Sequence, residues 1–78
     1  MLSYQALFQP EGDQIVITFP DLGHGATCAV NESEGKEMAA DFLETILGEM
    51  IRRGEDLPQA RYRRGRRYRA ITIPCPRV

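Results

Sequence analysis

The strongest constraint on the fold is a short β-branched run that stops at a proline. Residues 15–18 read Ile-Val-Ile-Thr, and Phe19-Pro20-Asp21-Leu22 follows directly. β-branched residues favour strands, whereas proline cannot donate to a β-ladder and fixes its own φ, so the strand must end in a tight corner. A chain of 78 residues buries only about 60–65% of its unfolded surface. We therefore expect a single small domain, residues 1–78, for which self-association is a reasonable default.

Alternating apolar residues predict a β-hairpin at the start of the chain. The expected strands span residues 3–9 and 14–19, and the segment 10–13 between them contains Gly12, which is suited to a tight turn. A third, short strand is expected over residues 26–30. The apolar positions that share one face of the hairpin are Tyr4, Ala6, Phe8, Ile15, Ile17 and Phe19.

A long amphipathic helix is predicted over residues 32–53. Asn31 followed by Glu34 resembles a capping box, and Gly54 suits the left-handed position that ends a helix. Gly48 lies inside the helix, where glycine is unfavourable, so close packing is expected there. The predicted apolar stripe is centred on Met38, Ala39, Phe42, Ile46 and Met50, with Leu43, Leu47 and Ile51 on its flank.

A final strand over residues 70–73 completes the order β-β-β-α-β. The expected fold class is α+β, a small, mostly antiparallel sheet with the helix on one face. If the last strand lies beside the first, the helix becomes a right-handed crossover. The register of that strand stays open, because either Arg69, Ile71 and Ile73 or Ala70 and Thr72 could face the helix.

Several classes of protein are poorly supported by the sequence. No apolar run approaches the roughly 18 residues of a membrane span, and the N-terminus lacks the pattern of a signal peptide, so we expect a cytoplasmic protein with no membrane partner. One histidine and two separated cysteines, Cys28 and Cys75, do not suggest a metal site, and such cysteines are most often small buried hydrophobes. No catalytic pairing is evident for His24, so we expect neither an enzyme nor a cofactor.

Charge is distributed very unevenly along the chain. Residues 1–50 contain nine acids and one lysine, a net charge of −8, whereas residues 51–78 contain nine arginines and two acids, a net charge of +7. Six of those arginines lie within residues 61–69, interleaved with Tyr62 and Tyr68. This asymmetry predicts two charged surfaces with different partners, or one half of the chain screening the other.

An ordered set of short motifs resembles the HicB family of bacterial antitoxins. Their order and spacing, more than any single one of them, carry the resemblance. The motifs are Tyr4-x-Ala6, Phe19-Pro20-Asp21-Leu22, Ala26-Thr27, Asn31-x-x-Glu34, Ala39 and Leu57-Pro58. The resemblance implies a partial RNase H-like fold. Many members add a C-terminal DNA-binding domain, which is not expected here, so autoregulation by that route is not implied.

The resemblance implies a protein that binds and neutralises a small, basic, RNA-cleaving, HicA-like toxin by occlusion. An acidic surface suits such a partner, because complementary charge speeds and orients association. Turn chemistry alone also accounts for Asp21. The residues expected to contact the partner are Pro20, Asp21, Leu22, His24, Glu37, Asp41 and Glu44.

Two alternatives rest on the arginine run. Basic residues interleaved with aromatic ones can hold phosphates and stack bases, which predicts a nucleic-acid-binding module. Alternatively, the arginines pair with acids of the chain's own helix, or they pair with the acidic helix of a second subunit, and the latter predicts a homo-oligomeric interaction domain. The residues expected to contact nucleic acid are Arg63, Arg64, Arg66, Arg67 and Arg69.

Overall fold

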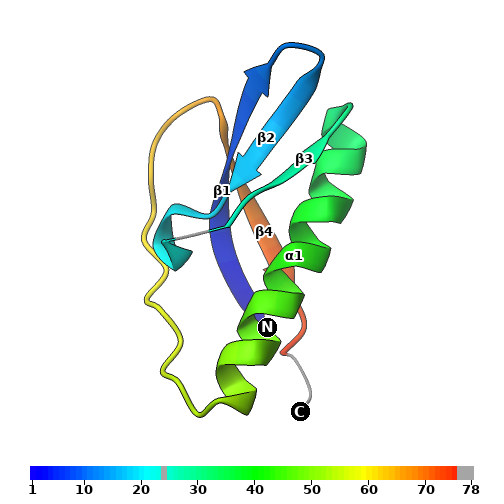
Figure 1. Ribbon diagram of the computed structural model, residues 1–78. Coiled ribbons are helices and arrows are strands. Elements are labelled where there is room, and N and C mark those ends of the chain that lie inside the picture. The colour runs from blue at the N-terminus through cyan, green and yellow to red at the C-terminus, as the bar shows by residue number, and fades with distance from the viewer. Residues whose placement is uncertain (24, 76–78) are drawn as a thin grey trace.

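The computed structural model describes residues 1–23 and 25–75, which form one sheet and one long helix (Figure 1). Its elements confirm the α+β class and the order β-β-β-α-β. They are β1 (Leu2–Glu11), β2 (Gln14–Thr18), the 3-10 turn η1 (Pro20–Leu22), β3 (Thr27–Ala29), α1 (Glu32–Arg52) and β4 (Tyr68–Ile73). No helix among the described residues is long and apolar enough to cross a membrane.

The four strands form an antiparallel sheet in the order β3-β2-β1-β4, and α1 packs on one face (Figure 1). β1 and β2 are joined by a two-residue turn in which Gly12 has φ +61°, a value that suits glycine. β4 lies beside β1 as expected, but antiparallel to it, because residues 53–67 carry the chain back along the sheet before β4 begins. The helix is therefore not a crossover between parallel strands.

The register of β4 places its isoleucines under the helix. Ile71 pairs with Tyr4 and Ile73 pairs with Leu2, and both isoleucines are almost completely buried. Thr72, which lies between them, and Ala70, which precedes Ile71, are on the opposite face and are exposed. The first of the two open registers is thus correct.

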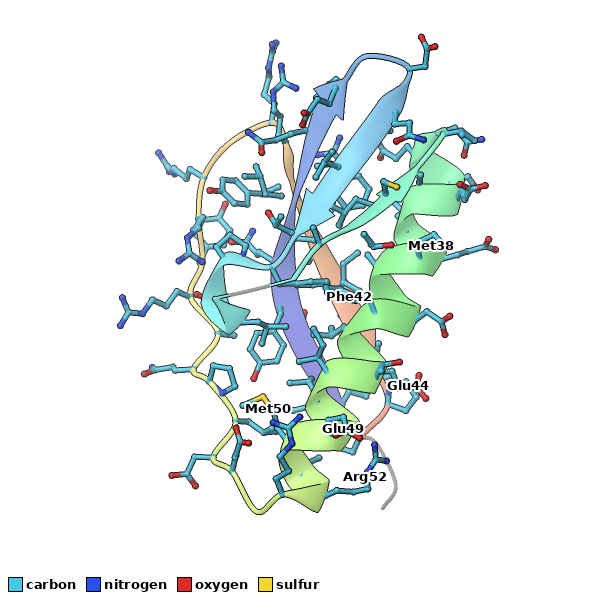
Figure 2. All side chains as sticks on the ribbon, viewed as in Figure 1. Met38, Phe42, Glu44, Glu49, Met50 and Arg52 are labelled. Atoms are coloured by element: carbon cyan, nitrogen blue, oxygen red, sulfur yellow. The ribbon has the colours of Figure 1, made fainter. Side chains whose placement is uncertain are left out.

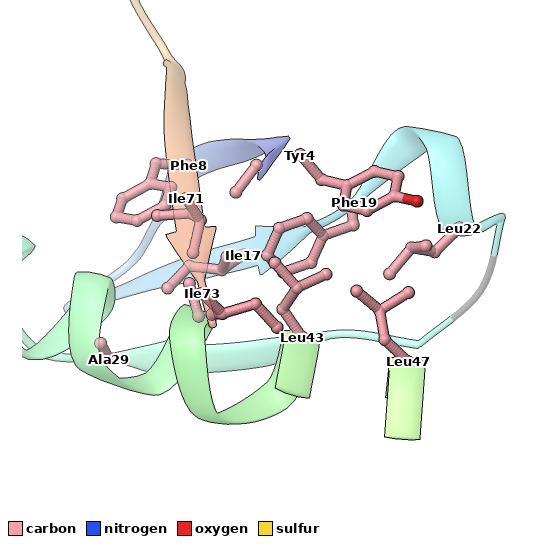
Figure 3. Packing of buried hydrophobic residues seen from close by; sticks show 12 residues of the cluster. Tyr4, Phe8, Ile17, Phe19, Leu22, Ala29, Leu43, Leu47, Ile71 and Ile73 are labelled. Carbon is pink, nitrogen blue, oxygen red and sulfur yellow. The ribbon is translucent and has the colours of Figure 1, made fainter. Parts of the chain in front are cut away.

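The core lies between the sheet and α1. Figure 3 shows the side chains of the strands and of the helix pointing toward one another across this layer. The largest fully buried side chains are Phe19, Ile17, Leu43, Leu47 and Ile73. Burying a side chain of this size contributes about 1.5–3 kcal/mol, so this layer is the main source of stability.

The helix packs on the sheet with the broad apolar stripe that was predicted, but the centre of that stripe is shifted. Its buried residues are Gly35, Ala39, Leu43, Leu47 and Gly48, whereas Phe42, Ile46 and Met50 pack at the edge and Met38 is 39% exposed. A Cβ atom on Gly35 would lie 2.8 Å from Phe8 Cε2 and 3.2 Å from Ile17 Cδ1. Small residues therefore let α1 approach the sheet closely along this stripe, and Leu43 and Leu47 form its centre instead of its flank.

Both ends of α1 are capped as expected. The side chain of Asn31 accepts a hydrogen bond from the Glu34 backbone N–H at 2.8 Å. At the other end Gly54 has φ +74° and donates to the Ile51 carbonyl, while Glu55 N–H donates to Met50. These last two bonds make a Schellman motif, which satisfies carbonyls that the helix leaves unpaired.

Candidate functional site

The Phe-Pro-Asp-Leu sequence forms a turn that is anchored on both sides by buried side chains. Pro20 begins η1, and the Leu22 N–H donates to the Phe19 carbonyl at 3.0 Å. Leu22 is 8% exposed and belongs to the core, and Phe19 packs against Phe42 with ring centroids 6.2 Å apart. Two of the residues expected to contact a partner, Pro20 and Leu22, therefore build the turn itself.

Asp21 reaches across the molecule to the arginine-rich segment. Its carboxylate accepts hydrogen bonds from the Arg61 backbone N–H at 2.9 Å and from Arg63 Nη1 at 2.7 Å. The side chain is only 4% exposed. Burial raises the pKa of Asp21, but the hydrogen bonds and charges of the two arginines outweigh it and hold the pKa below its usual value. Asp21 thus acts in long-range contacts, not only in its own turn.

Further contacts tie the same segment to β1. The Tyr4 hydroxyl donates to the Pro58 carbonyl at 2.5 Å, and the Gln5 side chain accepts a hydrogen bond from the Arg63 N–H. Burial and the nearby charge of Asp21 raise the pKa of Tyr4. Residues 58–63 are therefore held in place although they form neither helix nor strand.

The arginines divide into paired and exposed groups. Arg63 binds Asp21, and Arg69 makes two hydrogen bonds to Glu32, at 3.0 and 3.1 Å, while lying 5.8 Å from the centre of the Phe8 ring. Part of the arginine run is thus used inside the chain: Arg69 pairs with an acid of the helix, as one alternative expected, whereas the partner of Arg63 lies in the turn η1. The exposed arginines that form no ion pair within the described residues are Arg61, Arg64, Arg66 and Arg67.

The outer side of α1 carries an acidic strip formed by Glu37, Asp41 and Glu44. All three are exposed, and their spacing places them along one side of the helix. None of them forms an ion pair with any residue that the structure describes. We call these three residues the acidic helix face.

An open groove of about 220 Å³ lies between this face and β3. Figure 2 shows Met38 and Phe42 on the side of the helix that faces β3. Glu44 is not among the residues that line the groove. The groove is lined by Thr27, Met38, Asp41, Phe42 and Thr45. Carboxylates beside a partly exposed apolar groove provide both the charge and the apolar contact that a protein partner uses.

The remaining predicted site residue, His24, lies outside the described residues. The acidic helix face and the corner at Asp21 come from different parts of the fold, because the corner points its carboxylate toward the arginine segment. What sequence reasoning missed is the pairing of Asp21 with residues about forty positions later. No local signal marks such a contact.

The described residues contain no group of three His, Cys, Asp or Glu side chains placed to hold a metal ion. Cys28 and Cys75 are both exposed and unbridged, so the expectation that they are buried was wrong. Cys28 points away from the helix because its neighbour Ala29 points toward the core.

No model of a known protein family matches the chain, and no curated protein shows significant sequence similarity to it.

Proposed function

We propose that this protein is a HicB-like antitoxin of the cytoplasm, which binds a small basic RNA-cleaving toxin and blocks it by occlusion. The observation that carries the proposal is the acidic helix face, formed by Glu37, Asp41 and Glu44, whose side chains are exposed and lack ion pairs within the described residues. The ordered motifs that resemble this family support it independently.

The physical argument starts from charge complementarity. Unpaired carboxylates attract and orient a basic partner, and they do so without first breaking ion pairs of their own. The helix that carries them is capped at both ends and packed on the sheet, so little ordering is needed on binding. The groove beside Met38 and Phe42 adds apolar contact area next to the charges.

The corner residues support this proposal in a different way from the helix. Pro20 and Leu22 shape the turn, and Asp21 keeps the arginine segment attached to it. This arrangement neutralises part of the positive charge near the corner. The acidic helix face, which lies elsewhere in the fold, remains the proposed contact with the toxin.

The experiment is coexpression of this chain with the product of its nearest small neighbouring gene. We expect the two proteins to copurify at low salt and the chain to restore growth that the partner inhibits. Charge reversal at Glu37→Lys, Asp41→Lys and Glu44→Lys should weaken binding by at least about 100-fold, because like charges then face each other.

The matched control reverses three exposed acids elsewhere, with the substitutions Glu11→Lys, Asp13→Lys and Asp56→Lys. This control changes the net charge equally, so it should retain binding if the helix face is the contact surface. The proposal fails if a toxic neighbour is neither bound nor neutralised. The proposed surface is wrong if both triple variants lose binding to the same extent.

A further inference from the structure

The face of the sheet that points away from α1 carries almost no charge. Strand pairing identifies the outward positions, because Gln5 lies opposite Ala70, Leu7 opposite Tyr68 and Gln9 opposite Val16. The outward residues away from the hairpin tip are Ser3, Gln5, Leu7, Gln9, Val16, Thr18, Cys28, Tyr68, Ala70 and Thr72. In a chain with 27% charged residues, the outward positions of this sheet face therefore carry hydroxyl, amide and apolar groups and no charge away from the hairpin tip.

A groove of about 240 Å³ lies between this face and the segment after α1. It is lined by Ser3, Tyr4, Gln5, Ala60, Arg61, Tyr62 and Ala70. Tyr62 is 82% exposed, an unusual position for an aromatic side chain. The groove is held open by the bonds from Arg61 to Asp21 and from Arg63 to Gln5.

The exposed arginines lie on the same segment as Tyr62. Arg61 lines the groove, and Arg64, Arg66 and Arg67 follow it toward β4. In Figure 1 this segment, coloured yellow to orange, runs on the opposite side of the sheet from most of α1. The exposed positive charge is therefore separated from the acidic helix face.

We propose that this groove and the exposed arginines form a binding site for single-stranded nucleic acid. A base stacks on the Tyr62 ring, and successive phosphates contact Arg64, Arg66 and Arg67. An unstacked base offers an aromatic face to Tyr62, and a single strand follows a narrow groove more easily than a duplex does. The site does not depend on the proposed toxin binding, and it omits Arg63 and Arg69 because their guanidinium groups are already paired.

The test measures fluorescence anisotropy of labelled RNA and DNA strands of about 12 nucleotides, with a duplex and a poly-glutamate peptide as comparisons. We expect the single strands to bind more tightly than the duplex or the peptide, and binding to weaken as salt rises. The variant with Arg64→Gln, Arg66→Gln and Arg67→Gln should lower the slope of log affinity against log salt by about 2, because each phosphate contact contributes about 0.7.

Two controls separate this site from charge in general. Lys36→Gln, Arg52→Gln and Arg53→Gln remove the same net charge from α1 and its C-cap and should leave binding within about twofold of the wild type. Tyr62→Ala should weaken binding about tenfold or more, whereas Tyr62→Phe should retain it, because the ring and not the hydroxyl stacks.

The RNA and DNA arms decide which strand is the preferred ligand, and either preference supports the proposal. Absence of binding at low salt overturns it, as does equal weakening by the two triple variants or no effect of Tyr62→Ala. Equal affinity for poly-glutamate also overturns it, because the surface would then recognise acidic protein chains, including the helix of a second copy.

Discussion

Two regions of the molecule each place two arginines around one carboxylate, but they differ in how far that carboxylate is exposed to solvent. The corner cluster consists of Asp21, Arg61 and Arg63, and the helix-end cluster consists of Glu49, Arg52 and Arg53. In each, one carboxylate accepts hydrogen bonds from two arginine residues. The Asp21 side chain is 4% exposed, however, whereas that of Glu49 is 43% exposed.

This difference in burial determines what each cluster contributes. The corner cluster joins segments about forty residues apart, so it stabilises the tertiary fold. The helix-end cluster joins residues three and four positions apart at the end of α1. Its side chains are exposed, and water and salt weaken exposed ion pairs. The number of arginines around a carboxylate therefore does not predict how much the cluster stabilises the fold, because the exposure of the carboxylate decides this.

The largest expected effect separates the two carboxylates directly. Asp21→Ala should lower the free energy of unfolding by about 2 kcal/mol, because the Arg61 N–H and the Arg63 guanidinium lose their acceptor in a mostly buried site. Glu49→Ala should have a much smaller effect on stability, because water and salt weaken the ion pairs of this exposed side chain. Urea denaturation followed by circular dichroism measures both. Equal destabilisation by the two substitutions would contradict the comparison.

The glycines near the two clusters provide the next test. Gly25 has φ +83°, and a Cβ there would lie 2.8 Å from Phe42 Cζ, whereas Gly54 has φ +74° with nothing within 4 Å of such an atom. Both alanine variants are strained by their positive φ, at a cost of about 1–2 kcal/mol. Gly25→Ala must also displace the Phe42 ring, so it should destabilise the protein by about 1 kcal/mol more than Gly54→Ala.

Thermal denaturation of the two alanine variants and the wild type measures this difference. The Gly54 variant is the matched control, because it has the same backbone strain without the packing conflict. If Gly25→Ala is no more destabilising than Gly54→Ala, Phe42 moves aside without loss of contact. The corner would then be less tightly packed than its geometry indicates.

Local signals in the sequence predicted the elements of this fold. Asn31 and Gly54 marked the ends of the helix, and Gly12 marked the turn between the first two strands. Each of these signals works through a nearby backbone group, so it can be read from a few consecutive residues. The β1–β2 hairpin followed from these signals, whereas the sequence left the place of the last strand open, and the structure pairs β4 with β1 in the antiparallel direction.

Contacts between distant segments could not be predicted in the same way. The helix carries two apolar rows in which residues repeat every four positions, one through Phe42 and the other through Leu43. Periodicity alone therefore did not show which row would be central. The close approach of Gly35 to Phe8 and Ile17 decides this, and it depends on the shape of the sheet. The pairing of Asp21 with Arg63 depends on the path of residues 53–67, which contain no periodic pattern.

The smallest expected effect is a difference in acid sensitivity. The arginine contacts lower the pKa of Asp21 in the folded state, so its ionised form stabilises the protein at pH values above the unfolded pKa, about 3.9. That contribution is lost as the pH falls through the lower, folded pKa. Asp21→Asn lacks this ionisation and should lose less stability than the wild type between about pH 5 and pH 2.5.

Glu49 provides the comparison for this experiment. The hydrogen bond and charge of Arg52, together with those of Arg53, lower its pKa as well, so the sign of the effect is the same. Because Glu49 is much more exposed, added salt should remove its contribution, and Glu49→Gln should follow the wild-type acid profile at about 1 M salt. Asp21→Asn should remain less acid-sensitive at that salt concentration, since the carboxylate of Asp21 is much less exposed and its pair with Arg63 is screened less. Urea midpoints measured across this pH range, at low salt and at about 1 M salt, test this difference between Asp21 and Glu49. Identical pH profiles for the two variants would show that burial does not separate the two carboxylates.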